Sequence, residues 1–194
     1  MIKILLSLLL GLTISFAAES FKLNPEKVQV NWEAYKTLAK LGVKGTFNTV
    51  KLSTATEARE LSELLNGVSV TIDTASVNTQ NPGRDEILKN MFFGKLSQQS
   101  IEAKIVKTTL SAENAHDGTI DVLITMNGQE LTIPMAFTLE NSVINAKGTI
   151  DLFDFKADDA LASINKSCYD LHQGKTWNDV GISFTLQVEG ASKQ

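Results

Sequence analysis

The chain has 194 residues, a length that predicts one domain. Apolar residues make up 43% and charged residues 21%, an ordinary globular composition that excludes a disordered or fibrous protein. The formal net charge of −4 argues against a nucleic-acid-binding protein, which usually carries a basic excess. One cysteine excludes an intrachain disulfide framework, and two histidines leave little material for a histidine-rich metal site.

The first residues have the pattern of an export signal. A lysine precedes an almost wholly apolar stretch at 4–12, and small residues stand at Ser15 and Ala17. This is the order of a secretory signal peptide, and the apolar stretch is shorter than the roughly 20 residues that a spanning helix needs. We therefore expect residues 1–17 to be a signal peptide cleaved after Ala17. Residues 18–194 would then form one periplasmic domain without a stable membrane anchor.

Strands with one buried face are predicted along most of the remaining chain, because apolar and polar residues alternate there. The alternation covers eight segments, at 28–32, 43–52, 68–73, 101–110, 120–126, 131–139, 143–152 and 180–188. Asn127 and Gly128 predict a two-residue hairpin turn, since both residues tolerate a positive φ. Pro134 predicts an edge strand or a bulge, because proline cannot donate a ladder hydrogen bond.

Three segments break the alternation and predict short helices. Residues 54–57 have capping-box spacing ahead of a helix that ends at 66–67. Asn81 and Pro82 supply an N-cap and a first-turn proline for the second helix. The third helix begins at Asp158. Its apolar stripe is formed by Leu161, Ile164, Cys168 and Leu171.

Sequential strands with tight turns predict a mostly β fold, namely an antiparallel eight-stranded β-barrel with a few short helices. A barrel of this size is either filled by side chains or holds one small ligand. Ala146 and Gly148 lower the packing volume on one inner face, which favours a cavity. The apolar side chains expected on the inner faces are Val70, Ile72, Ile133, Met135, Phe137, Ile144, Phe184 and Leu186.

Aromatic and charged residues are expected near the barrel mouth. Phe92 and Phe93 end the second helix and either plug the mouth or line its entrance. Trp32 and Trp177 suit a rim, where the ring is apolar and the N–H stays wet. Arg84, followed by an aspartate, is either a polar anchor for a head group, or part of an ordinary surface ion pair or a charge at the helix N-terminus.

No catalytic or metal-binding motif emerges from the sequence. Cys168 and His172 are spaced for one helix face, but a single pair falls short of the three or four ligands of a usual site. Cys168 lies in an apolar stripe and is expected to be a small buried residue. The sequence contains no nucleophile elbow, zinc-protease motif or glycine-rich phosphate loop. We therefore expect a protein that is not an enzyme and has no cofactor.

Several segments resemble the YceI-like family of exported bacterial proteins. The most specific runs from Val70 to Thr79 (VTIDTASVNT) and continues through the RDEIL segment at 84–88 to Phe92 and Phe93. The VKGTF segment at 43–47, the hairpin at 124–134, and Asp154 with Phe155 are similar to further family motifs. Two positions depart from the pattern, with Thr37 in place of a histidine and no arginine ahead of Asp154.

The resemblance implies a lipocalin-like barrel whose interior binds a polyisoprenoid or another long-chain amphiphile. The expected partner is a long-chain lipid or isoprenoid, such as a polyisoprenoid, an isoprenoid quinone or a fatty-acid derivative, carried in the periplasm. The expected ligand site combines the eight inner-face residues with Phe92, Phe93 and Gly148. The alternative is a structural or stress-related interaction protein with a filled barrel and no ligand. A monomer and a homodimer both remain open.

Overall fold

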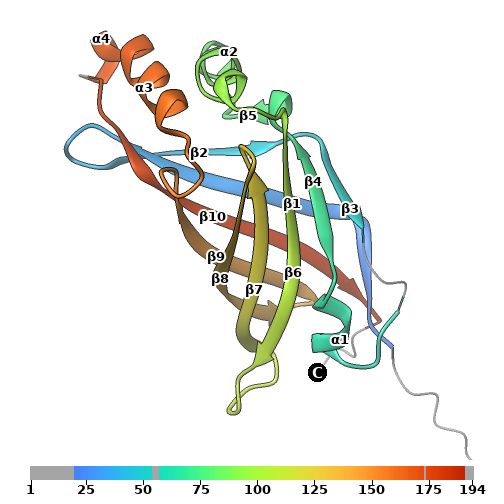
Figure 1. The fold of residues 1–194 in the computed structure, drawn as a ribbon. Coiled ribbons are helices and arrows are strands. Elements are labelled where there is room, and N and C mark those ends of the chain that lie inside the picture. Colours follow the sequence, from blue (N-terminus) through green and yellow to red (C-terminus); the bar gives the residue numbers. More distant parts are fainter. Residues whose placement is uncertain (1–19, 54–56, 173, 191–194) are drawn as a thin grey trace, which may run out of the picture.

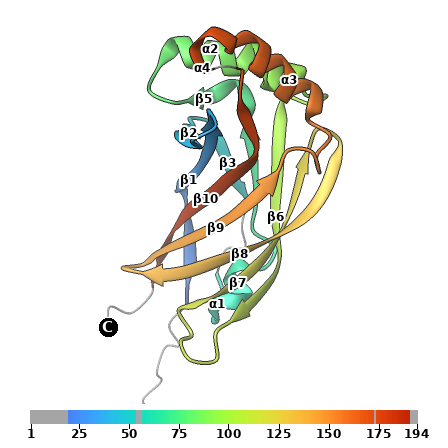
Figure 2. The same cartoon turned by 90° about the vertical axis from the view of Figure 1, so that its left-hand side faces the viewer.

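Ten antiparallel strands form one strongly curled sheet around an apolar interior (Figures 1 and 2). The computed structural model describes residues 20–53, 57–172 and 174–190. The expected signal peptide and the start of the expected capping box therefore lie outside the described residues. The strands follow the order β3-β4-β6-β7-β8-β9-β10-β1-β2-β5. Their bounds are β1 (Lys22–Lys36), β2 (Leu41–Phe47), β3 (Val50–Ser53), β4 (Ser69–Asp73), β5 (Val77–Asn78), β6 (Ser100–Leu110), β7 (Asp117–Met126), β8 (Gln129–Glu140), β9 (Val143–Asp151) and β10 (Thr176–Glu189).

The mostly β, lipocalin-like class is confirmed, with ten strands in place of about eight. The difference arises partly at 43–52, where the chain turns a corner at Asn48 and Thr49 instead of continuing as one strand. The backbone N–H of Asn48 donates to the Ser76 carbonyl at 3.0 Å, and that of Thr49 donates to Ser76 Oγ at 2.9 Å. These bonds separate β2 from β3. The two-residue strand β5 then pairs with β2.

The corner also brings the two ends of the sheet together. Strand β3 stands at one end of the strand order, while β2 lies near the other end. Beyond β3, Phe21 and Ala58 form an isolated antiparallel bridge, and each backbone N–H donates to the other carbonyl at 2.9 Å or less. The first half of β1 therefore runs alongside β3, and the curled sheet encloses its inner face.

Short helices cover both ends of this enclosure (Figures 1 and 2). Helices α2 (Pro82–Met91), α3 (Asp158–Ser167) and α4 (Tyr169–His172) lie at one end, which we call the helical end. Helix α1 (Leu61–Leu65) lies at the other, which we call the α1 end. Two 3-10 turns, Thr74–Ser76 and Phe93–Lys95, complete the helical end.

The predicted start of α2 is confirmed, because Asn81 Oδ1 accepts from the Arg84 N–H and Pro82 occupies the first turn. Helix α1 is shorter than expected and begins only at Leu61, because Ala58 is engaged in the bridge. The expected apolar stripe of the third helix is wrong at its last member. The helix breaks at Cys168, and Leu171 in α4 is 74% exposed.

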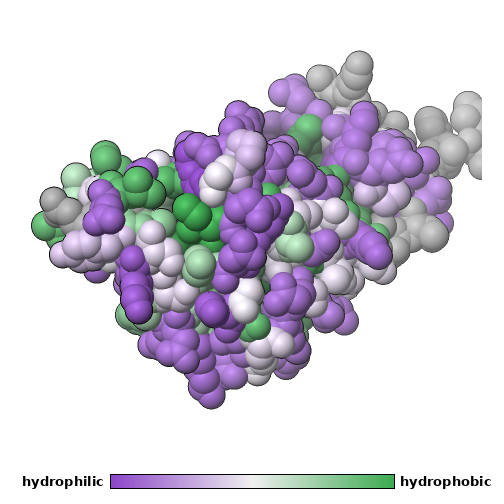
Figure 3. All heavy atoms as spheres, turned by 90° about the horizontal axis from the view of Figure 1, so that it is seen from above, coloured by the Kyte–Doolittle hydropathy of each residue, from purple (hydrophilic) through white to green (hydrophobic). Residues whose placement is uncertain are grey.

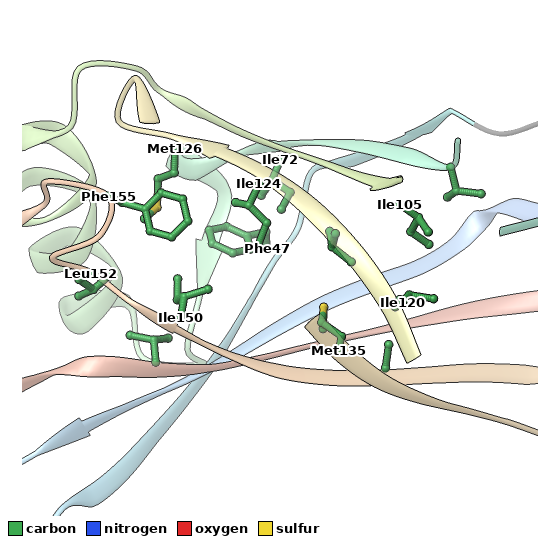
Figure 4. Packing of buried hydrophobic residues seen from close by; sticks show 14 of the residues in the cluster. Phe47, Ile72, Ile105, Ile120, Ile124, Met126, Met135, Ile150, Leu152 and Phe155 are labelled. Carbon is green, nitrogen blue, oxygen red and sulfur yellow. The ribbon is translucent and has the colours of Figure 1, made fainter. Parts of the chain in front are cut away.

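The core differs between the two ends. Around the α1 end, large side chains pack without exposed surface, among them Leu64, Leu65, Ile120 and Ile144. Figure 4 shows Phe155, Met126 and Leu152 grouped near the helical end, with Ile120 and Met135 on the opposite side of the view. Side chains therefore fill the interior at the α1 end, and Phe47, Ile72, Ile124 and Ile150 lie between the two groups in the same view.

Candidate ligand-binding site

An elongated cavity of about 170 Å³ lies inside the curled sheet and reaches toward the helical end. Its lining is almost wholly apolar. The polar residues on it are Asn31, Ser69, Thr176 and Ser183, together with the indoles of Trp32 and Trp177. Within the part of the chain that the structure describes, no ionisable side chain lines it. Such a surface offers dispersion contacts and water exclusion to a hydrocarbon chain.

The lining extends a long way along the strands. On β10 it runs from Trp177 to Leu186, a distance of about 30 Å along an extended strand. Several inward-facing side chains, such as Val30, Val70 and Phe184, are only half-buried because they border this space. The shape therefore suits an elongated ligand better than a compact one.

The structure brings most of the expected site residues to this cavity. The seven that line it are Val70, Ile72, Phe92, Phe93, Met135, Phe184 and Leu186. The other four, Ile133, Phe137, Ile144 and Gly148, share the inner-face register of β8 and β9 without lining the cavity. Phe137 and Ile144 belong to the filled part of the core, where they are 2% and 0% exposed.

Gly148 and Ala146 do not create the cavity that their small side chains led us to expect on this inner face. An ideal Cβ on Gly148 would lie 2.8 Å from Met135 Cγ and 3.3 Å from the Pro134 carbonyl oxygen, so β8 already occupies this position. Ala146 is fully buried between Phe137 on β8 and Phe184 on β10, its partners in the ladder. The small size of Gly148 and Ala146 allows neighbouring strands and side chains to pack closely against them. Pro134 lies just outside the stretch of β8 that pairs with β9, in keeping with its missing N–H.

The ligand site expected from the sequence left out the residues of two strands that form much of the wall. Strand β1 contributes Val28, Val30, Trp32 and Ala34, and β6 contributes Ile101, Ala103 and Ile105. Both strands were predicted from their alternation, which already marks these residues as members of one face. The signal was therefore present in the apolar positions of 28–34 and 101–105.

Three phenylalanines close the helical end above the cavity. The rings of Phe92 and Phe93 meet edge to face at 5.1 Å between centroids, and those of Phe47 and Phe93 at 5.7 Å. Helix α2 ends at Met91, and the backbone changes direction at Phe92, where φ is −115° and ψ is −70°. This change lets two consecutive side chains both face inward. All three phenylalanines line the cavity.

Trp32 does not occupy a rim, in contrast to the expectation. It lies within β1, four residues before the end of the strand, and its ring covers Gly45, its partner on β2. A side chain at position 45 would occupy the space of this ring, which explains the glycine of the VKGTF segment. Trp32 Nε1 is buried and has no hydrogen-bond partner among the described residues.

Trp177 does stand at the helical end, but its N–H is not left to solvent. Nε1 donates to the carbonyl oxygen of Thr37 at 2.7 Å. The ammonium of Lys40 lies 4.5 Å from the centre of the ring, and that of Lys175 lies 4.2 Å from it. Lys40 Nζ also forms an ion pair with Asp179 at 2.8 Å. The indole therefore joins the apolar lining to a cationic surface.

The segment that contains Arg84 organises the loop beside α2. Asp85 Oδ1 accepts from the backbone N–H of Thr79 at 2.8 Å and from its hydroxyl at 2.6 Å. Asn78 Nδ2 donates to Asn48 Oδ1 at 3.0 Å. Among the described residues no ion pair involving Arg84 is found, and Arg84 does not line the cavity. Of the alternatives expected for Arg84, the structure shows its place in the first turn of α2.

Cys168 is buried at the end of α3, as its apolar stripe predicted, with 7% of its surface exposed. Burial raises the pKa of the Cys168 thiol, and the positive charge of Lys36 partly opposes this shift. No group of three or more candidate metal ligands is found in the ranges 20–53, 57–172 and 174–190. Over the same ranges, none of the helices is long and apolar enough to cross a bilayer.

Comparison with known proteins finds one matching family and several similar structures. A family model described as the YceI-like domain matches residues 21–188. A polyisoprenoid binding domain from Saccharophagus degradans has a TM-score of 0.58 at 14% identity, covering 89% of this chain and 99% of that chain. BcnA from Burkholderia cenocepacia has a TM-score of 0.60 at 13% identity, with coverages of 87% and 99%. A YceI protein from Campylobacter jejuni has a TM-score of 0.54 at 20% identity, with coverages of 78% and 86%. No curated protein matches the sequence.

Proposed function

We propose, from the premise that this chain belongs to the YceI-like family, that it binds and carries a long-chain amphiphilic lipid in its barrel. The candidate ligands are a polyisoprenoid, an isoprenoid quinone and a fatty-acid derivative. The observation that carries the proposal is the elongated cavity, whose lining includes no ionisable side chain of the described residues. The similar structure from Saccharophagus degradans is a polyisoprenoid binding domain, which supports the same ligand class.

The binding energy would come from removing the hydrocarbon chain from water. Each buried CH₂ contributes about 0.8 kcal/mol, so a tail of about fifteen carbons supplies on the order of 12 kcal/mol before costs. Loss of translational and conformational freedom offsets much of this gain. Met126 and Met135 lie in the lining, and their flexible thioether chains can adjust to tails of different shape. The ligand site that we propose is the set of cavity-lining residues.

The carrier would act outside the cytoplasm. The amino-terminal pattern of residues 1–17 predicts export to the periplasm and removal of the signal peptide. We propose a binding role without catalysis or cofactor, since the described residues that line the cavity offer a hydrocarbon surface and no nucleophile–base pair. The competing proposal is an interaction protein that keeps an unoccupied barrel.

Extraction of the purified protein separates the two proposals. The protein would be prepared from its host without detergent, extracted with organic solvent and examined by mass spectrometry. A lipid recovered at about one molecule per chain supports the carrier role. Repeated preparations without any co-purifying lipid, and no uptake of long-chain isoprenoids or fatty acids by the delipidated protein, would favour the interaction protein.

A further inference from the structure

Large apolar side chains are exposed on two neighbouring segments at the helical end. Leu38 and Leu41, on the hairpin between β1 and β2, are 79% and 55% exposed, while Tyr169 and Leu171 of α4 are 66% and 74% exposed. We call these four residues the hairpin–α4 patch. Single exposed apolar residues are common on soluble proteins, but a group of large ones marks an interaction site.

The two segments of the patch adjoin in space. The backbone N–H of Thr37 donates to the carbonyl oxygen of Lys175 at 2.9 Å, which joins the hairpin to the chain that follows α4. The ion pair between Lys40 and Asp179 makes a second connection. Figure 3, a view onto the helical end, shows hydrophobic residues at the side where Figure 1 places α4 and this hairpin.

The two segments that carry the patch have a positive net charge. The segments 36–44 and 166–179 contain five lysines and two aspartates, a net charge of +3 in a chain whose formal net charge is −4. One of the two aspartates, Asp179, is paired with Lys40. A local positive charge on an acidic protein selects for an anionic partner.

The patch is also continuous with the ligand cavity. Trp177 lines the cavity, and the ammonium groups of Lys40 and Lys175 lie against its ring. A surface that held the hairpin and α4 would therefore lie next to the part of the cavity that Trp177 lines, at the helical end. For a lipid carrier, this is the place where a ligand tail would leave a bilayer and enter the protein.

We infer that the hairpin–α4 patch docks the protein onto a bilayer surface that contains anionic phospholipids. Leucine and tyrosine side chains would enter the boundary between head groups and acyl chains, and the surrounding lysines would meet lipid phosphates. A protein partner would need a matched apolar groove with acidic flanks. A bilayer offers an apolar interior beneath anionic phosphates, and it is the source of the ligand class proposed above.

Vesicle sedimentation tests the docking directly. Delipidated full-length mature protein is mixed with vesicles of phosphatidylglycerol and phosphatidylethanolamine, or with vesicles of phosphatidylcholine alone. We expect binding to the anionic vesicles that weakens as salt is raised. The double substitution Leu38→Glu and Leu171→Glu should weaken that binding at least tenfold. Val106→Glu is the matched control, since Val106 is 46% exposed on the outer wall of β6, and it should bind as the parent does.

The outcomes separate docking from ligand binding. Absence of parent binding to anionic vesicles, or equal losses in the double variant and in Val106→Glu, would overturn the docking. A parent that forms dimers without vesicles, with the double variant monomeric by analytical ultracentrifugation, would instead assign the patch to a second copy of the chain. The inference rests on the proposed function only for the origin of the ligand. Loss of docking with lipid still found on extraction would leave the carrier role intact.

Discussion

The side chain of Asn127 binds the backbone of Phe155: its Nδ2 donates a hydrogen bond to the Phe155 carbonyl oxygen at 3.0 Å. The same nitrogen donates to the Lys156 carbonyl at 2.8 Å, and Oδ1 accepts from the Ser97 N–H at 2.8 Å. One turn residue therefore ties the β7–β8 hairpin to the loops that precede α3 and β6. The phenyl ring of Phe155 is 0% exposed beneath this junction. The Asn-Gly and Asp-Phe motifs thus shape the helical end and do not form the cavity lining.

Asn127→Gly should destabilise the protein by about 2–3 kcal/mol, because three hydrogen bonds are lost and their backbone partners lie near the core. Glycine tolerates the positive φ of 52°, so backbone strain does not contribute. Asn141→Gly is the matched control: Asn141 has a φ of 51° in the β8–β9 turn, and no side-chain hydrogen bond of Asn141 is found within the described ranges. Denaturant unfolding measures both. Equal stability of the two variants would contradict the role assigned to Asn127.

The strands and one helix start could be predicted because local patterns determine them. Alternation gave the faces of β4, β8 and β10, and the N-cap and proline at 81–82 gave the start of α2. The corner at Asn48 and Thr49 could not be predicted, because hydrogen bonds to Ser76, a residue distant in sequence, create it. The exposure of Leu171 was missed for a related reason, since helical periodicity continues in the sequence beyond the break at Cys168.

The inner face of the barrel could be predicted, but the depth of its cavity could not. Phe137 and Phe184 both pair with Ala146, from opposite sides, and both face inward. Phe137 is 2% exposed in the filled core, whereas Phe184 borders the cavity. Alternation assigns a side chain to a face, and only the packing of distant strands decides whether that place is filled. For this reason Gly148, expected beside a tail, lies against Met135.

Phe137→Ala should cost about 3–5 kcal/mol of folding stability, since it empties a packed site. Phe184→Ala should cost clearly less in the delipidated protein, because part of that side chain already borders empty space. Urea unfolding of both variants gives the comparison. A larger loss for Phe184→Ala than for Phe137→Ala would mean that the filled and hollow regions have been assigned the wrong way round.

Cys168 should react slowly with thiol reagents in the native protein and rapidly after denaturation. Burial raises the pKa of its thiol, so the native state holds the proton to higher pH than the unfolded chain does. This contribution to stability is complete below the ordinary thiol pKa of about 8.5 and is lost as pH rises through the higher native pKa. Lys36→Met removes the cation that opposes the shift and should slow native labelling further. Fast labelling of the folded parent would show an accessible thiol.

The mature protein should begin at Ala18 or within a few residues of it. Small residues at Ser15 and Ala17 fit the positions before a signal-peptidase cleavage site. Amino-terminal sequencing of protein released from the periplasm checks this, and Ala17→Tyr, which places a bulky residue before the cut, should accumulate uncleaved precursor. Recovery of soluble parent protein that still starts at Met1 in a washed periplasmic fraction would contradict cleavage.

A side chain that fills the cavity should displace ligand without unfolding the protein. Ala103 on β6 lines the cavity and is half-buried, so Ala103→Leu extends into empty space and should change the stability of the delipidated protein by less than about 1 kcal/mol. Its bound lipid after purification should fall well below that of the parent. Ala146→Leu is the matched control, because Ala146 is fully buried on the same inner face and does not line the cavity.

The control enlarges a filled site and should destabilise the delipidated fold by about 1–3 kcal/mol. Denaturant unfolding, combined with lipid content by mass spectrometry, distinguishes the two variants. If Ala103→Leu destabilised the delipidated protein as much as Ala146→Leu does, the lining of β6 would be packed core. If Ala103→Leu instead kept both its stability and the full lipid content of the parent, the tail would have to lie elsewhere than against Ala103.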